Sequence, residues 1–115
     1  MDVYIKLPGH ATSLLRPGYE HWLPVQGLHF ERPLLEKDPA RFTVYKMPDA
    51  LSAVLAGLAA RGDTLRRVEV HRVEGHQALG RLHFDQVRIS SLRIDGESDL
   101  AMERVSFSAR RWQDG

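Results

Sequence analysis

The histidines of this sequence are its first candidates for metal chemistry, because neutral imidazole is a common metal ligand. A zinc site needs three or four ligands that converge on one point. His71 and His76 flank an expected hairpin and could approach each other, but no third ligand accompanies them. The helix expected at 49–61 contains no histidine. We interpret all six as surface side chains and expect neither metal nor cofactor: His10, His21, His29, His71, His76 and His83.

Hydroxyls and carboxylates do not form a catalytic set either. Four serines lie in segments of strand-like alternation, outside any Gly-x-Ser-x-Gly elbow: Ser90, Ser91, Ser106 and Ser108. Four carboxylates are close in sequence but belong to an expected exposed turn and its flank: Asp95, Glu97, Asp99 and Glu103. The glycines match no phosphate-binding loop, and the absence of cysteine excludes a thiol nucleophile. We expect no enzymatic activity.

Trp22 and Trp112 leave a binding function open. Either could form a platform for a carbohydrate or a peptide, which would make the protein a small monomeric β-barrel binding module. A tryptophan at a strand end more often anchors a core or an interface.

Length and charge narrow the class further. A chain of 115 residues has the size of one domain, so we expect a single domain over 1–115. Sixteen basic and fifteen acidic residues are interleaved and give a net charge of +1, which disfavours nucleic-acid partners and membrane insertion. The N-terminus lacks the basic and apolar regions of a signal peptide, so we expect a cytoplasmic protein that is exported, if at all, without one.

The first half of the chain alternates like strands. Residues 3–7 place Val, Ile and Leu on one face. Residues 21–30 predict a second strand whose phase changes at Gln26-Gly27, which indicates a β-bulge. Residues 31–41 predict a loop or projecting hairpin, and 42–45 a short strand.

A single helix is expected at about 49–61. Asp49 is a suitable N-cap, and Gly62 can take the left-handed conformation that ends a helix. The apolar stripe has helical spacing and consists of Leu51, Val54, Leu55 and Leu58. Gly57 is expected to let a neighbouring strand approach closely.

The second half returns to a period of two. Strands are expected at 65–73 and 79–94, and a last one runs from Val105 toward Trp112. The long strand changes phase near 85–86 and 90–91, so it must bend or bulge there. Bent antiparallel strands with one covering helix predict a mainly β fold, an antiparallel β-barrel.

The order of these segments resembles a known family, the haemolysin-coregulated proteins (Hcp) of type VI secretion. Five stretches, in order, are similar to Hcp segments: 3–7 (VYIKL), 21–25 (HWLPV), 47–51 (MPDAL) with the alanine-rich helix, 87–92 (VRISSL) and 103–108 (ERVSFS). The resemblance implies a barrel with an outer helix that forms hexameric rings. The rings stack into a tube, are exported, and meet sheath, spike and effector proteins. Phage tail-tube subunits share this fold, so a phage-like tail-tube assembly protein is an alternative.

Two sets of residues would make contacts if the chain forms such a tube; in a monomeric barrel the lumen-facing set would simply be an outer face of the strands. The ring-stacking loop would contain Glu31, Arg32, Glu36, Lys37, Asp38 and Arg41. The lumen-facing side chains would be Arg67, Glu69 and His71, with Arg88 and Ser90 as a second set.

Overall fold

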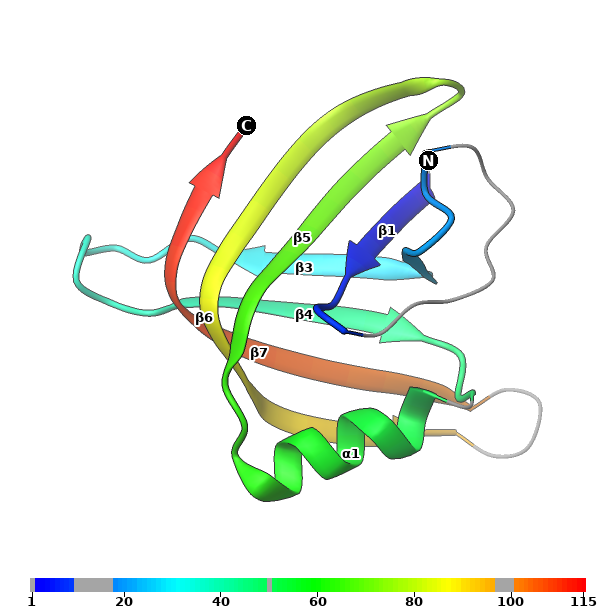
Figure 1. The fold of residues 1–115 in the computed structure, drawn as a ribbon, viewed down its shortest axis with the longest axis vertical. Helices are drawn as coiled ribbons and strands as arrows, with labels where there is room; N and C mark the ends of the chain where they lie inside the picture. The colour runs from blue at the N-terminus through cyan, green and yellow to red at the C-terminus, as the bar shows by residue number, and fades with distance from the viewer. Residues whose placement is uncertain (1, 10–17, 50, 97–100) are drawn as a thin grey trace.

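One curled antiparallel sheet makes up most of the structure, a computed structural model that describes residues 2–9, 18–49, 51–96 and 101–115 (Figure 1). Its strand order is β2-β1-β5-β6-β7-β4-β3. The elements are β1 (Asp2–Lys6), β2 (Leu23–Val25), β3 (Gly27–Glu31), β4 (Ala40–Lys46), α1 (Leu51–Arg61), β5 (Leu65–Glu74), β6 (Gln77–Asp95) and β7 (Met102–Asp114). The predicted mainly β, barrel-like fold with one helix is confirmed.

The sheet closes at one corner through the chain itself. β2 and β3 stand at opposite ends of the strand order, yet only Gln26 separates them in sequence. The Gln26 amide donates a hydrogen bond to the carbonyl oxygen of Tyr45 at 2.7 Å, and its side-chain oxygen accepts one from Met47 at 3.1 Å. The prediction of one strand over 21–30 with a β-bulge was wrong, because the phase change at Gln26-Gly27 is the point where the chain leaves one sheet edge and joins the other.

Three neighbouring strands change phase at the same level. In β6, Phe84 and Val87 are both buried although they are three residues apart, and Gln86 between them has φ of 52°. β5 and β7 make the same shift, so the register between the three strands is unchanged across this level. The predicted irregularity near 85–86 is confirmed as a common bend, and the one near 90–91 is a register shift between Ile89 and Ser91.

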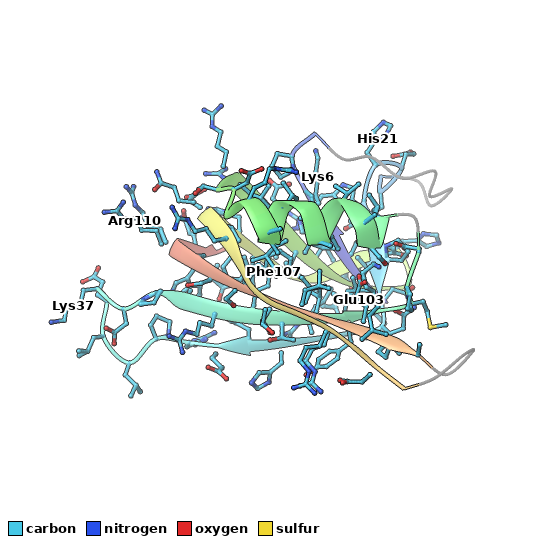
Figure 2. All side chains as sticks on the ribbon, turned by 90° about the horizontal axis from the view of Figure 1, so that it is seen from below. Lys6, His21, Lys37, Glu103, Phe107 and Arg110 are labelled. Carbon is cyan, nitrogen blue, oxygen red and sulfur yellow. The ribbon has the colours of Figure 1, made fainter. Side chains whose placement is uncertain are left out.

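The core fills the concave side of the sheet. Phe42 stacks between Phe84 and Phe107, with ring centroids 4.0 and 4.7 Å apart. The helix α1 covers this core through Leu55 and Leu58, and Figure 2 shows Phe107 between α1 and the strands. Stacked aromatic rings and a helical lid bury much of the apolar surface that drives folding.

The ends of α1 agree with the predicted caps. The Leu51 amide donates to the Asp49 carboxylate at 2.9 Å, so Asp49 is the N-cap. At the other end Gly62 has φ of 65°, and the amides of Gly62 and Asp63 donate back to carbonyls of the last turn. The expectation for Gly57 was wrong, because a side chain there would meet the Arg61 guanidinium of the same helix. Within the described ranges no helix is long and apolar enough to cross a membrane.

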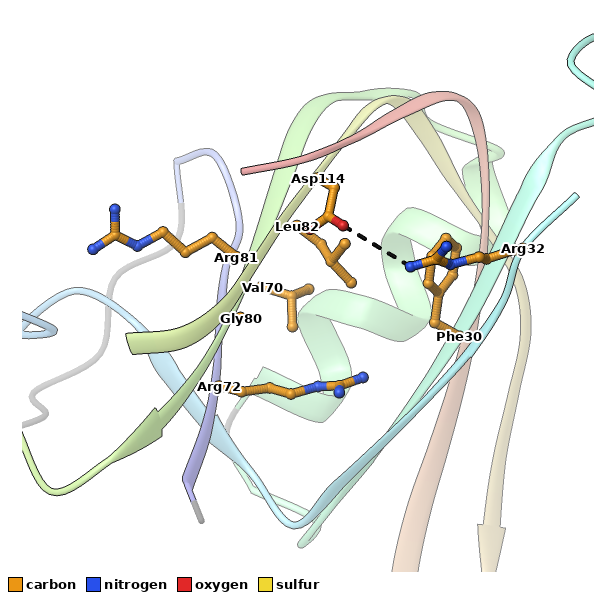
Figure 3. Close-up of a pocket in the computed structure, with 8 residues that line it drawn as sticks. All are labelled: Phe30, Arg32, Val70, Arg72, Gly80, Arg81, Leu82 and Asp114. Carbon is orange, nitrogen blue, oxygen red and sulfur yellow. Dashed lines mark ion pairs between the residues drawn. The ribbon is translucent and has the colours of Figure 1, made fainter. Parts of the chain in front are cut away.

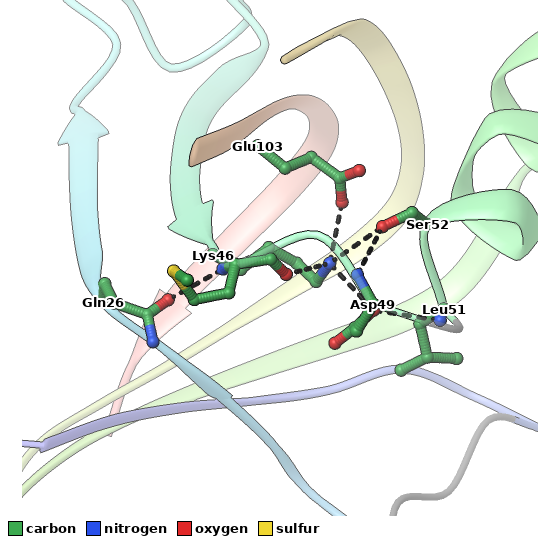
Figure 4. Close-up of polar contacts among 7 residues, drawn as sticks. Gln26, Lys46, Asp49, Leu51, Ser52 and Glu103 are labelled. Atoms are coloured by element: carbon green, nitrogen blue, oxygen red, sulfur yellow. Dashed lines mark hydrogen bonds and ion pairs between the residues drawn. The ribbon is translucent and has the colours of Figure 1, made fainter. Parts of the chain in front are cut away.

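A buried ion pair connects α1 to the sheet (Figure 4). Lys46, at the end of β4, and Glu103, near the start of β7, are 1% and 0% exposed, and Lys46 Nζ lies 2.8 Å from Glu103 Oε1. The ammonium also donates to the Met47 carbonyl oxygen and the Ser52 hydroxyl, and lies 3.0 Å from Asp49 Oδ1. Because charge in a core needs every partner in place, this pair holds the last residue of β4 against β7 and the helix N-terminus.

Removal of one partner of the pair is expected to destabilise the fold strongly. Lys46→Met leaves the Glu103 carboxylate buried without its cation, and should lower the free energy of unfolding by about 3–5 kcal/mol in urea titration. The double variant Lys46→Met/Glu103→Leu replaces both charges by apolar groups and should recover most of that loss. Lys37→Met, an exposed lysine, is the control and should change stability by less than about 0.5 kcal/mol. A double variant less stable than Lys46→Met would contradict this.

Candidate assembly surfaces

We call the sheet face turned away from the core the outer face. On its β5–β6–β7 half, polar side chains form cross-strand rows. Arg67 Nε donates to Asp85 Oδ1 at 2.8 Å, and the hydrogen bond holds the pKa of Asp85 below its ordinary value. Glu69 stands opposite His83, whose Nε2 lies 3.0 Å from Gln113 Oε1. Part of the charge on this half is therefore paired within the sheet.

The other half of the outer face lies beyond the common bend and contains β4 with the later part of β6 and the first part of β7, and short hydroxyls make it polar. The hydroxyls of Thr43 and Ser106 lie 3.0 Å apart, and the Ser90 hydroxyl donates to the Ser106 carbonyl oxygen at 3.2 Å. Arg88 Nε donates to the Thr64 hydroxyl at 3.1 Å. The structure thus brings the two predicted lumen-facing sets onto one face, although they come from different halves of the sheet.

His71 lies in a different environment from the other predicted lumen-facing residues. It packs with Tyr4, Tyr19 and Trp22 in what we call the aromatic cluster, with ring centroids 4.4 Å from Trp22 and 5.6 Å from Tyr19. The Tyr19 hydroxyl lies 3.0 Å from His71 Nδ1. Burial, followed by the nearby Arg81 cation, lowers the pKa of His71, while Glu69 raises it.

The aromatic cluster was not anticipated from the sequence, because its members are up to 67 positions apart and only β1–β5 pairing brings them together. It also removes Trp22 as an open platform, since that side chain is 8% exposed. Trp112 packs against Phe30, with centroids 4.9 Å apart. Both tryptophans therefore act as anchors.

The connection between β3 and β4 projects from the sheet, as predicted for 31–41 (Figures 1 and 2). Glu31 ends β3 opposite Arg41 on β4, and the remaining predicted stacking residues lie in the connection between them. Its tip carries two apolar side chains that the sequence analysis did not single out, Leu34 and Leu35, which are 98% and 54% exposed. In the sequence, two adjacent leucines between Pro33 and the charged residues that follow could have indicated this exposed apolar tip.

Arg32 differs from the rest of that predicted set. Its guanidinium carbon lies 5.5 Å from the centre of the Trp112 ring, and its Nη2 is 3.9 Å from Asp114 Oδ2. The side chain therefore turns back over the barrel instead of extending to the tip. Among all residues that the structure describes, no three histidine or carboxylate side chains lie close enough together to hold a metal ion.

Solved structures identify the architecture. Hcp1 from Salmonella typhimurium superposes with a TM-score of 0.83 at 15% identity, over 98% of this chain and 83% of that one. This chain has the Hcp fold. Hcp3 from Pseudomonas aeruginosa gives 0.77 at 18% identity, covering 99% and 95%, and a type VI secretion system effector from Yersinia pestis gives 0.82 at 17%, covering 98% and 88%.

Sequence comparison adds nothing to the Hcp likeness: no family model matches the chain, and no curated protein matches it either. At these sequence identities the structural likeness establishes the fold. It confirms, for the fold, the resemblance to Hcp drawn from the five short stretches.

Acidification is expected to destabilise the fold through His71. The folded state holds the pKa of His71 below its ordinary value of 6.5, so the unfolded chain binds this proton first as the pH falls. The contribution of neutral His71 is complete above 6.5 and is lost as the pH decreases from there toward the folded pKa.

Urea titrations between about pH 8 and pH 5 measure this loss. His71→Asn should remove that part of the pH dependence, whereas His83→Asn, one row away on the outer face, should retain it. Equal pH dependence in the native protein and His71→Asn would rule out this role for His71.

Proposed function

We propose that the protein is a tube subunit of a type VI secretion system that forms hexameric rings. The observation that carries the proposal is the match of 95–100% of the chain to Hcp structures. In this proposal the subunit is made in the cytoplasm, is exported without a signal peptide, and meets the sheath, spike and effector proteins of its system.

The sheet edges support ring formation. Among the described strands, β2 and β3 each have a neighbour on one side only. Unpaired edges favour association with other chains. A head-to-tail contact that joins different surfaces of successive copies closes into a ring when the rotation between copies is a simple fraction of a turn.

The outer face supports a water-filled lumen. It carries the Arg67–Asp85 ion pair, and the hydroxyls of Thr43 and Ser106 lie within hydrogen-bond distance of each other. Such a polar face stays hydrated at little cost. In the proposed tube Arg67, Glu69, Arg88 and Ser90 line the lumen, and His71 stands beside them within its cluster.

The projecting connection supports stacking of rings. An exposed pair of leucines on a protruding tip gains free energy when a neighbouring ring covers it, about 25 cal/mol for each Å² of apolar surface buried. The charged residues around it, Glu36, Lys37 and Asp38, would set the register between rings.

Native mass spectrometry of the purified protein is expected to show six copies per particle, and negative-stain microscopy should show rings. The ring should persist at low protein concentration, because it closes through six equivalent contacts. Only monomers or dimers across the concentration series would overturn the proposal.

The double variant Leu34→Asp/Leu35→Asp is expected to keep the rings but lose tubes, because two carboxylates replace the apolar tip that a second ring would cover. Micrographs at high protein concentration would measure the fraction of stacked rings. Arg61→Gln/Asp63→Asn removes an exposed ion pair at the end of α1, away from the connection, and should retain the stacking. Tubes of native length in the aspartate variant would show that the tip is not the stacking contact.

A further inference from the structure

A pocket of about 300 Å³ opens at one mouth of the barrel, between β3 on one wall and β5 and β6 on the other (Figure 3). We call it the mouth pocket. The volume is at the lower end of the range for small-molecule sites. It lies on the core side of the sheet, so it is separate from the outer face and from the Leu34–Leu35 tip.

The floor of the mouth pocket is apolar. Val70 is almost fully buried and belongs to the core, and Leu82 and Phe30 are partly buried against it. A ligand in this position would therefore meet hydrocarbon on its inner side, which favours an apolar group by about 25 cal/mol for each Å² covered.

The rim of the mouth pocket is cationic. Arg32 and Arg72 extend into it from opposite walls, whereas Figure 3 shows the Arg81 guanidinium directed away. The carboxylate of Asp114 also lines the pocket but lies 3.9 Å from Arg32 in an exposed position, which makes a weak pair. The side chain of Arg72 has no hydrogen bond or ion pair with any residue that the structure describes.

The local backbone gives Arg72 its place at the rim. It continues the inward-facing series of Val68 and Val70 on β5, where a third apolar residue would extend the core. Its partner on β6 is Gly80, and the Arg72 stem lies over that glycine, with its Cδ 3.7 Å from where a Cβ would stand. An arginine without an acidic partner therefore stands at the end of an apolar floor.

We propose that the mouth pocket binds an amphipathic anion, a carboxylate at the end of a short apolar chain. Arg72 and Arg32 hold the carboxylate. The apolar chain lies on Phe30, Val70 and Leu82. The geometry of guanidinium groups suits carboxylates, which they can bind through two parallel hydrogen bonds. Asp114 competes for Arg32, so it weakens binding.

Three probes separate the two parts of the proposed ligand. Octanoate carries both, acetate carries only the carboxylate, and octanol carries only the chain. In NMR titrations, octanoate is expected to saturate and to shift the amide signals of Val70, Gly80 and Leu82. With acetate or octanol at the same concentrations, the shifts of these amide signals should not reach saturation. Equal binding of acetate or of octanol, or no saturable binding of octanoate, would overturn the proposal.

Two substitutions with opposite expected effects test the rim. Arg72→Gln should weaken octanoate binding about 10-fold or more, because it removes a charge-assisted hydrogen bond. Asp114→Asn should tighten binding about 3-fold, because it removes the competing carboxylate. Arg93→Gln, an exposed arginine on the outer face, should change nothing. Urea titrations of each variant exclude loss of folding, and unchanged affinity in Arg72→Gln would overturn the role of the rim.

A second comparison of affinities distinguishes two sources of such a ligand, a fatty acid and the C-terminus of a protein. An acetylated leucine dipeptide with a free C-terminal carboxylate presents the same chemistry as octanoate. Tighter binding of the peptide would indicate a protein C-terminus, and tighter binding of octanoate a fatty acid; either result supports the proposal. Equal binding of the amidated peptide would overturn it. The measurements do not require rings, so their outcome is independent of the tube proposal.

Discussion

The buried ammonium of Lys46 is the constraint on which much of this fold depends. Its partners come from the residue after β4, the start of β7 and the first turn of α1. A buried charge is stable only when all of these groups are in place. The ion pair therefore fixes both the alignment of β4 with β7 and the position of α1 on the sheet. That alignment and that position determine how the aromatic rings of the core pack.

The common bend in β5, β6 and β7 has a similar cooperative origin. If only one strand changed phase, its apolar side chains would turn outward while those of its neighbours stayed inside. Because all three change at one level, the ladder remains in register and the sheet curls. The left-handed conformation of Gln86 is the local cost of that curvature. The outer face consequently stays polar on both sides of the bend.

The arginines of the outer face and those of the mouth pocket have different surroundings. On the outer face, Arg67 is paired with the Asp85 carboxylate and Arg88 donates to the Thr64 hydroxyl. At the mouth of the barrel, Arg72 lacks such a partner and adjoins hydrocarbon. An arginine beside hydrocarbon offers an amphipathic anion both a charge and an apolar surface, which is why the proposed ligand site lies at the mouth and not on the outer face.

The sequence alone determined most strand segments, the helix with both of its caps, and the positions near Gln26 and Gln86 where the alternation changes phase. These features depend on the local alternation of apolar and polar residues and on the backbone preferences of single residues, so they can be predicted from the sequence. Only the tertiary structure decided that Lys46 meets Glu103, that His71 enters the aromatic cluster, and that Arg32 turns toward the barrel mouth. Each of these contacts joins segments far apart along the chain. Their geometry depends on sheet curvature, which no local pattern specifies.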